Sequence, residues 1–467
     1  MQFRNFGKNV NFSPKYFYEP KTEIDVLEIL NKHKNGQIRA IGSGHAWSHA
    51  IESQDAFVDL KNLNEIKIIS ENGKDSVSVG GGCKLEHLLK TISKSGFTIP
   101  AMGGIMRQTV AGLASTATHG TGRSSFSHYI EEVRLAAYDS NGNAKIYEFK
   151  DGKELLAART AVGCMGIILS LKIPCLPKYW ITEQTKAFKT IDEVLEQEKY
   201  WPLQQTVVIP HLWQFFGFQR KIDLEPKNKA LFAVRRFFDY LTVEIIPHLF
   251  LKTFLIINSQ KLILNYYTKF LPKFLIPVTV TNEDYKALTL HTRHHYTFTH
   301  VETEIFIPER NIKAAFHAIT QVTDWFAGTL EELDLELQDK LKEKNLLDYL
   351  VDKKGAYLLH YTPFIRKVMP DDSLIAMTSG NEAYYAIGFF TYHQEKDRSG
   401  YYDFAKTLSL LLNKLFEARL HWGKNYPLEH KDIERLYPKM EEFKQICRSV
   451  DPNGVFQNEF TKKVFGF

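Results

Sequence analysis

The sequence has few cysteines and no arrangement of them that indicates a metal site. Among 467 residues only Cys83, Cys164, Cys175 and Cys447 occur, and they form no C-x-x-C pair. Zinc and disulfide frameworks need closely spaced or paired cysteines. We therefore expect reduced thiols and no metal.

Long apolar runs are also missing. Residues 1–7 show no apolar stretch after their basic residue, so we expect no secretory signal. A membrane-spanning helix needs about 20 apolar residues. The best candidate, residues 240–277, is interrupted by four lysines: Lys252, Lys261, Lys269 and Lys273. We therefore expect no spanning segment and a cytoplasmic protein that is at most peripheral on a membrane.

Charge of one sign is not in excess. The 59 basic and 54 acidic residues are interspersed and leave a net charge of +5, which gives no reason to expect a nucleic-acid partner. Apolar residues make up 44% and charged residues 24%, a balance typical of globular proteins. The length predicts two or three domains.

The pattern of short apolar runs and glycine turns predicts an α+β protein. Composition changes after Pro177, because residues 178–300 are poor in glycine and rich in aromatic, aliphatic and lysine residues. We expect strands at 37–41, 56–60, 76–79, 132–138, 144–149, 301–308 and 384–392. We expect helices at 21–33, 85–96, 309–326, 404–419 and 430–448.

Three small-residue segments are candidates for binding an extended ligand. In the first, Gly42-Ser43-Gly44-His45-Ala46, two glycines allow the backbone to approach a phosphate, although a tight turn with a surface histidine is an equal alternative. The second covers 103–112 and 117–122, where small residues suit close passage along a pyrophosphate better than a purely structural loop. The third, 162–168, leads a glycine pair into an apolar strand.

These segments, in this order, resemble the FAD-binding domain of the vanillyl-alcohol oxidase superfamily and differ from the Rossmann fingerprint. Residues 420–424 (Leu-His-Trp-Gly-Lys) and 451–458 resemble the closing signatures of its aldonolactone and alditol oxidase branch. The resemblance covers nearly the whole chain. It implies a PCMH-type FAD-binding domain at 1–177 and an α+β substrate (cap) domain at 178–410 with an apolar insertion near 236–277. A C-terminal segment, 411–467, would return to complete the flavin site.

The same resemblance implies that His45 forms a covalent bond to the flavin 8α-methyl group. It places the following residues along FAD: Gly42, Ser43, Gly44, Ala46, Gly103, Gly104, Gln108, Gly112, Ser115, Thr118, His119, Gly120, Gly122, Gly166, Ile168, His421 and Lys424.

Catalytic roles also follow from the resemblance. Lys424 matches a lysine whose charge would stabilise the reduced flavin, and Arg366 matches an active-site arginine. The sequence departs from the branch at Phe364, where glutamate is expected, and at Phe389, which aligns with a second polar position. Both changes predict a drier pocket. Glu304 matches an acidic residue of the family and would substitute for the missing carboxylate, or else serve the structure.

The resemblance predicts hydride transfer from an alcohol carbon of a sugar-like substrate, an aldonolactone or polyol, to flavin N5. Oxygen would be the acceptor and would yield hydrogen peroxide. Gly103 favours an oxidase, because a dehydrogenase of the superfamily has alanine there. Three alternatives stay open: a dehydrogenase using a quinone or cytochrome, an oxidase of an apolar or lipid-linked alcohol, and a flavin-binding protein without turnover.

The apolar insertion at 236–277 leaves two interpretations equally open. Lysines beside aliphatic and aromatic residues suit an interfacial helix on anionic lipid. The alternative is an apolar face buried in the second domain or in a dimer contact.

Overall fold

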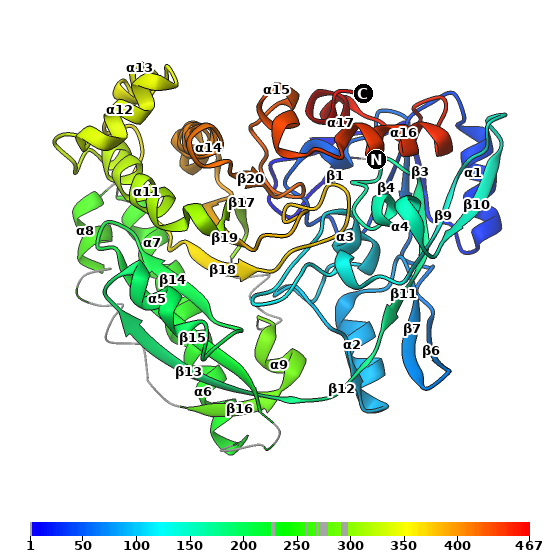
Figure 1. Cartoon of the computed structure of the whole chain (residues 1–467), viewed down its shortest axis with the longest axis horizontal. Helices are drawn as coiled ribbons and strands as arrows, with labels where there is room; N and C mark the ends of the chain where they lie inside the picture. The colour runs from blue at the N-terminus through cyan, green and yellow to red at the C-terminus, as the bar shows by residue number, and fades with distance from the viewer. Residues whose placement is uncertain are drawn as a thin grey trace.

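A computed structural model describes residues 2–467 except 224, 226–228, 258, 267–268, 270–278 and 291–297. Two halves lie side by side (Figure 1). The half that holds most of the first 177 residues contains a three-stranded and a five-stranded sheet with two small two-stranded ones, β1 (Phe3–Arg4) with β2 (Asn11–Phe12) and β8 (Phe97–Thr98) with β12 (Leu176–Pro177), and the other half is built on one large sheet. The last helices of the chain return to the first half, so both chain ends lie near each other.

The first half combines a parallel sheet with an antiparallel one. The parallel sheet has the order β3 (Tyr16–Tyr18), β5 (Ala56–Asp59), β4 (Ile38–Ile41). The antiparallel sheet has the order β10 (Ala144–Phe149), β9 (Glu132–Tyr138), β11 (Ile167–Pro174), β7 (Lys74–Gly80), β6 (Ile66–Glu71). Around them lie α1 (Glu23–Lys32), α2 (Leu85–Lys94), α3 (Val110–Ser115) and α4 (Gly152–Ala158). A short hairpin of β1 (Phe3–Arg4) and β2 (Asn11–Phe12) precedes both sheets.

The second half is an eight-stranded sheet whose order shows that distant segments meet. It runs β16 (Val280–Glu283), β13 (Trp180–Phe188), β15 (Gln214–Asp223), β14 (Gln205–Ile209), β18 (Phe364–Val368), β19 (Tyr384–Tyr392), β17 (His300–Pro308), β20 (Arg419–Leu420). Helices α5 (Ile191–Gln197), α11 (Ile312–Ala327) and α14 (Glu395–Phe416) pack against it, and α12 (Leu335–Glu343) and α13 (Leu347–Val351) follow α11. Every residue of β17 and β19 is buried, because these strands are covered on both faces.

The apolar insertion forms helices that join α6 (Lys229–Asp239) to α9 (Asp284–Leu288). A π-helical turn, Tyr240–Ile245, leads into α7 (Ile246–Ile256) and α8 (Gln260–Asn265). Residues 267–268 and 270–277 of the insertion lie outside the described residues. Among the described residues no helix is long and apolar enough to cross a membrane.

Several expected elements differ from the structure. The helix expected at 404–419 is longer, because α14 runs from Glu395 to Phe416. It therefore spans position 410, where the resemblance led us to expect a domain boundary. The helix expected at 430–448 is broken into α15 (His430–Ile433), a 3-10 turn and α16 (Met440–Val450). Pro438 explains the break, because it cannot donate to the preceding turn and disfavours helix before it. The last helix is α17 (Glu459–Phe465).

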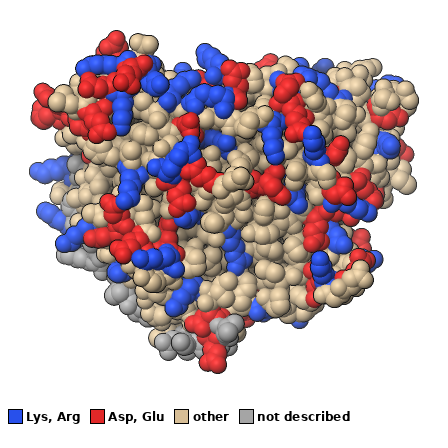
Figure 2. Space-filling view, viewed as in Figure 1, with Lys and Arg blue, Asp and Glu red and all other residues tan. Residues whose placement is uncertain are grey.

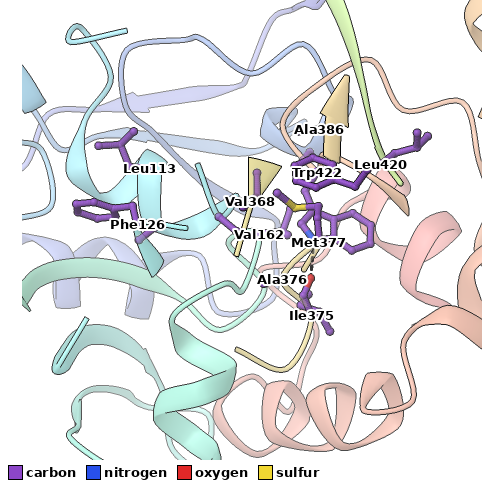
Figure 3. Close-up of a cluster of buried hydrophobic side chains, with 14 of the residues drawn as sticks. Leu113, Phe126, Val162, Val368, Ile375, Ala376, Met377, Ala386, Leu420 and Trp422 are labelled. Carbon is purple, nitrogen blue, oxygen red and sulfur yellow. Dashed lines mark hydrogen bonds between the residues drawn. The ribbon is translucent and has the colours of Figure 1, made fainter. Parts of the chain in front are cut away.

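One apolar cluster joins the halves and fixes the C-terminal motif. Figure 3 shows Trp422, which follows β20, beside residues of the loop after β18. The indole Nε1 of Trp422 donates to the carbonyl of Ile375 at 2.7 Å. Val162 of the first half and Val368 of β18 belong to the same cluster. The segment that carries Lys424 is therefore held rigidly between the two halves.

Candidate active site

A cavity of about 340 Å³ lies between the first half and the large sheet. Its walls come from all three small-residue segments, from β17, β18 and β19, and from the segment after β20. A cavity of this size, bounded by both halves, suits a small-molecule site.

The first segment leaves β4 and turns at once along the cavity. The backbone of Gly44 has φ of +66°, a conformation that favours glycine. A side chain at Gly42 would collide with Thr109 of the second segment, so the two loops approach closely. His45 is buried and lines the cavity, whereas the Ser43 hydroxyl donates to the Arg107 carbonyl at 2.5 Å.

The third segment shows the same need for small residues. Gly166 has φ of +129°, and a side chain there would collide with the carbonyl of Ala136 on β9. In the second segment, a Cβ at Gly103 would lie 2.7 Å from Cγ2 of Thr118. Such backbone-lined walls fit an extended cofactor, as expected for FAD.

Most of the expected FAD contacts line this cavity, and two do not. Lining residues are Gly42, Ser43, Gly44, His45, Ala46, Gly103, Gly104, Gln108, Gly112, Ser115, Thr118, His119, Gly166, Ile168, His421 and Lys424. Gly120 instead borders a smaller neighbouring cavity, and its Cβ position lies 2.8 Å from the Met102 carbonyl. A side chain at Gly122, where φ is +69°, would collide with the carbonyl of Pro202. At each of these two glycines, the backbone of another segment of the chain passes in close contact.

Strand β17 presents two carboxylates to the cavity. Glu302 and Glu304 are two residues apart, so their side chains share one face, while Thr303 on the other face accepts a hydrogen bond from the Tyr401 hydroxyl at 3.0 Å. The exposed fractions of the two acids are 3% and 1%. Carboxylates at such burial need cationic partners.

Each carboxylate has its own cation. Glu304 forms an ion pair with Arg366 of β18, and Nε2 of His119 lies 3.3 Å from its Oε1. Glu302 forms an ion pair with Lys424. Burial raises the pKa of Glu304, but Arg366 and His119 outweigh it and hold the pKa well below the usual range. At Glu302 burial is likewise outweighed, chiefly by Lys424, so the pKa is lowered. Both acids are ionised at neutral pH.

His421 is neutral in this setting. Burial lowers the pKa of His421 to about 3, and its Nδ1 accepts the Gly423 N–H at 3.0 Å. Ligand atoms of His119, Glu304 and His421 lie within 4.8 Å of one another, as in metal sites. The guanidinium of Arg366 already neutralises Glu304, which disfavours a second cation.

Lys424 is fixed from several directions. Its ammonium lies 4.3 Å from the centre of the Trp47 ring in addition to its ion pair with Glu302. The Trp47 indole donates to the His300 carbonyl at 2.6 Å, and the Trp47 N–H donates to the Gly423 carbonyl at 2.8 Å. The His45 loop and the C-terminal motif therefore meet at Trp47.

An aromatic wall lies beside the charged residues on the same face of the large sheet. Phe364 and Phe390 meet edge-on with ring centres 5.6 Å apart, and Phe298 and Tyr361 extend the same wall. Phe364 precedes Arg366 by two residues on β18, so both side chains share the cavity face. The cavity thus has one ionic side and one apolar side.

The assignment of Phe389 to the pocket was wrong. Phe389 pairs with Thr303 across the sheet, and its ring lies on the opposite face, 5.9 Å from the ring of Phe404. Phe390 occupies the cavity face, opposite Glu302. An alignment shifted by one residue reverses the face of every side chain in a strand.

Sequence reasoning also missed several cavity residues. Glu302 carried a signal, because it stands two residues before Glu304 in an alternating strand. Trp47, next to His45, gave only the weak signal of an aromatic in a glycine loop. His300 and Tyr361 come from segments without a recognisable motif, and only the tertiary structure brings them to the cavity.

Comparisons with known proteins agree with this geometry. Residues 171–464 match the family described as D-arabinono-1,4-lactone oxidase, and residues 14–143 match the FAD binding domain family. A long-chain alcohol oxidase from an uncultured marine euryarchaeote is 36% identical and covers 98% of this chain and 96% of its own length. The L-gulonolactone oxidase of Mus musculus is 24% identical over 100% and 98% of the two chains.

The fold has also been seen in a solved structure. A cholesterol oxidase from B. sterolicum superimposes with a TM-score of 0.75 at 13% identity, over 99% of this chain and 96% of that one. At this identity the likeness concerns the fold alone. The expected two-part α+β flavoprotein fold is confirmed.

Proposed function

The chain belongs to the D-arabinono-1,4-lactone oxidase family of FAD-dependent oxidases, and we propose that it oxidises a primary alcohol borne on an apolar chain. The observation that carries this proposal is the aromatic wall beside the ionic residues of the cavity. The name of the long-chain alcohol oxidase relative supports the same class of substrate. A sugar lactone or polyol stays the alternative, but its hydroxyl groups would find no hydrogen-bonding partner on that wall.

The two sides of the cavity suggest how such a substrate would lie. The alcohol oxygen would meet the ionic side near Arg366, and the hydrocarbon chain would follow Phe364 and Phe390. Each buried methylene contributes about 0.8 kcal/mol of binding. A sugar would instead place hydroxyls against aromatic faces, at a cost in lost hydrogen bonds to water.

The residues divide the chemistry between them. When bound, FAD supplies the acceptor for the hydride that leaves the alcohol carbon. Lys424 would hold a positive charge beside the flavin, and Arg366 would orient the alcohol. The hydroxyl proton needs an acceptor, and the ionised Glu302 and Glu304 line this part of the cavity. Because cations hold both acids, their positions are set before substrate arrives.

A chain-length series tests this proposal. We expect kcat/KM for linear primary alcohols to rise by about fourfold per methylene until the apolar side is filled, since 0.8 kcal/mol corresponds to that factor. Flavin bleaching without oxygen and peroxide release in air would be measured for each alcohol. Higher kcat/KM on aldonolactones or alditols, with no dependence on alcohol length, would overturn the proposal.

Neighbouring phenylalanines provide a matched control for the series. Phe390→Leu changes the cavity wall, whereas Phe389→Leu makes the same change on the opposite face of β19. Only Phe390→Leu is expected to lower the increase in kcat/KM per added methylene. An equal effect of both variants would point to a general loss of packing.

We also propose that His45 bonds covalently to FAD. The support is its position on the cavity wall within the loop that resembles the family. Bond formation replaces one imidazole N–H and one C–H of the 8α-methyl group by an N–C bond. Oxygen takes up the two electrons and two protons as hydrogen peroxide. Flavin that stays with acid-denatured protein, and is lost in His45→Ala, would support the bond; complete release from the wild type would refute it.

A peripheral membrane contact through α6, the π-helical turn, α7 and α8 is our third proposal. Leu249 and Ile256 on α7 are 66% and 70% exposed, and Lys252 and Lys261 lie among the apolar residues. Arg236 and Tyr240 of the same insertion line the cavity, so an apolar alcohol would pass directly from lipid to the site. Figure 2 shows positive and negative side chains mixed over the viewed face, without a dominant patch of one sign.

Vesicle flotation tests this contact. We expect the protein to float with anionic lipid vesicles and Leu249→Glu to abolish flotation. Leu335→Glu is the control, because Leu335 on α12 is equally exposed, at 75%. Failure of the wild type to float would refute the proposal. If the wild type instead forms a dimer that Leu249→Glu dissociates, the exposed apolar face of α7 binds a second copy of the chain.

A further inference from the structure

The N-terminal hairpin of β1 and β2 precedes the region matched by the FAD-binding family, which begins at residue 14. Its turn packs directly against the His45 loop. Gly7 is buried, and a side chain there would collide with the Trp47 indole. Lys8 has φ of +55°, so the chain reverses sharply at this contact.

Hydrogen bonds join the hairpin to three backbone carbonyls of the loop. The Phe6 N–H donates to the Gly44 carbonyl at 2.8 Å. Nδ2 of Asn5 donates to the carbonyl of Ala46, and Nδ2 of Asn9 donates to that of Trp47, both at 2.8 Å. Each carbonyl on either side of His45 is thereby fixed by residues from a separate element.

The side chain of His45 is held as well. The Phe6 ring stacks on the imidazole with ring centres 5.0 Å apart and an interplanar angle of 30°. Phe6 is itself wedged edge-on against Trp47 at 5.9 Å and His300 at 5.4 Å. The imidazole therefore has one face covered by a ring that the large sheet also supports.

We propose that this hairpin positions the His45 imidazole for attachment to FAD, with Phe6, Asn5 and Asn9 as positioning residues. The inference rests on the proposed His45 bond. Covalent attack requires the nitrogen and the methyl carbon to be held in one orientation, and misplacement by about 1 Å costs on the order of 100-fold in rate. Phe6 limits rotation of the ring, and the two asparagines fix the backbone that carries it.

The test is the fraction of flavin that stays with the polypeptide after acid denaturation, measured beside total FAD and the unfolding temperature. We expect Phe6→Leu and Asn9→Ala to bind total FAD as the wild type does but to lower the covalent fraction several-fold in newly made protein. Phe6→Tyr, which keeps the ring, should restore attachment. Phe17→Leu is the matched control, because Phe17 packs against Phe57 in the apolar cluster that holds Phe3 and Phe12 of the hairpin, away from His45.

The outcomes separate the two proposals. Wild-type protein that releases all of its FAD would overturn the His45 bond and, with it, the role of the hairpin. Covalent flavin in the wild type together with an equal covalent fraction in Phe6→Leu and Asn9→Ala would overturn the hairpin's role alone. An equal loss in Phe17→Leu would also overturn it, since the effect would then come from general packing. Gly7→Ala, which would displace the turn from Trp47, should lower the covalent fraction of FAD in the same way.

Discussion

Replacing Lys424 by methionine removes the cation from a buried carboxylate. Glu302 is 3% exposed and forms an ion pair with Lys424, and its nearest other cationic candidate, Nε2 of His300, lies 3.9 Å away. Removing one partner of a buried pair costs about 3–5 kcal/mol of folding free energy, because the remaining charge is left uncompensated. We expect Lys424→Met to be destabilised by this amount at neutral pH.

The sign of the pH dependence follows from the pKa of Glu302. In the wild type this pKa is lowered, so the pair contributes stability above the unfolded pKa, about 4.3, and loses it as pH falls through the folded value. Without Lys424, the effect of burial prevails and raises the pKa of Glu302. The variant then keeps its stability at low pH and loses it as pH rises. The gap between the two proteins should therefore be widest near neutrality and close towards about pH 4.

Urea unfolding of the FAD-loaded protein, followed by circular dichroism at several pH values, measures this gap. The double variant Glu302→Gln, Lys424→Met is the control, because its gap to the wild type should not depend on pH through this pair. A gap below about 1 kcal/mol at neutral pH is the size of a surface ion pair and would refute the reasoning. A gap that is constant with pH would refute it equally.

Three further predictions follow from the cavity walls. Phe364→Glu should lower kcat/KM for long-chain alcohols by about 10- to 100-fold, because up to about 3 kcal/mol of apolar contact is lost. The same change should raise kcat/KM for polyols, and steady-state kinetics on both classes of substrate test both effects. Gly103→Ala should slow reoxidation of reduced flavin by oxygen more than by a dye, and stopped-flow mixing measures both. Gly166→Ala should reduce FAD content and stability by more than Gly73→Ala, since both glycines have positive φ but only Gly166 faces backbone within contact distance.

Local patterns in the sequence predicted several strands well, although they missed β13, β14, β15, β16 and β18 of the large sheet. The ranges 132–138, 144–149 and 384–392 coincide with β9, β10 and β19, because alternating or continuous apolar residues bounded by turn residues specify strands without tertiary information. The glycine loops that line the cavity were predicted for a similar reason. Glycine at a close approach is required by the local backbone, so the requirement is visible in the sequence.

Contacts between distant segments could not be read in this way. The ion pair of Arg366 with Glu304 forms because β18 and β17 lie on either side of β19. No local sequence pattern predicts this strand order. The face of Phe390 depends on the register of β19 with β17, which a one-residue error reverses. The hairpin clamp on His45 likewise joins residues about 40 positions apart through hydrogen bonds to backbone carbonyls, which leave no signature in side-chain composition.

Phenylalanine at position 364, where the resemblance leads us to expect glutamate, is compatible with the ionic residues beside it. Arg366 does not depend on residue 364 for its counter-charge, because Glu304 reaches it from another strand. Glu302 and Lys424 form their own pair, so the four charges balance without a fifth group. Phenylalanine at 364 therefore removes no ion pair from the cavity, and its ring is in contact with that of Phe390. Under the proposed function, residues of β18 and β19 can therefore set the substrate preference without disturbing the two ion pairs of the cavity.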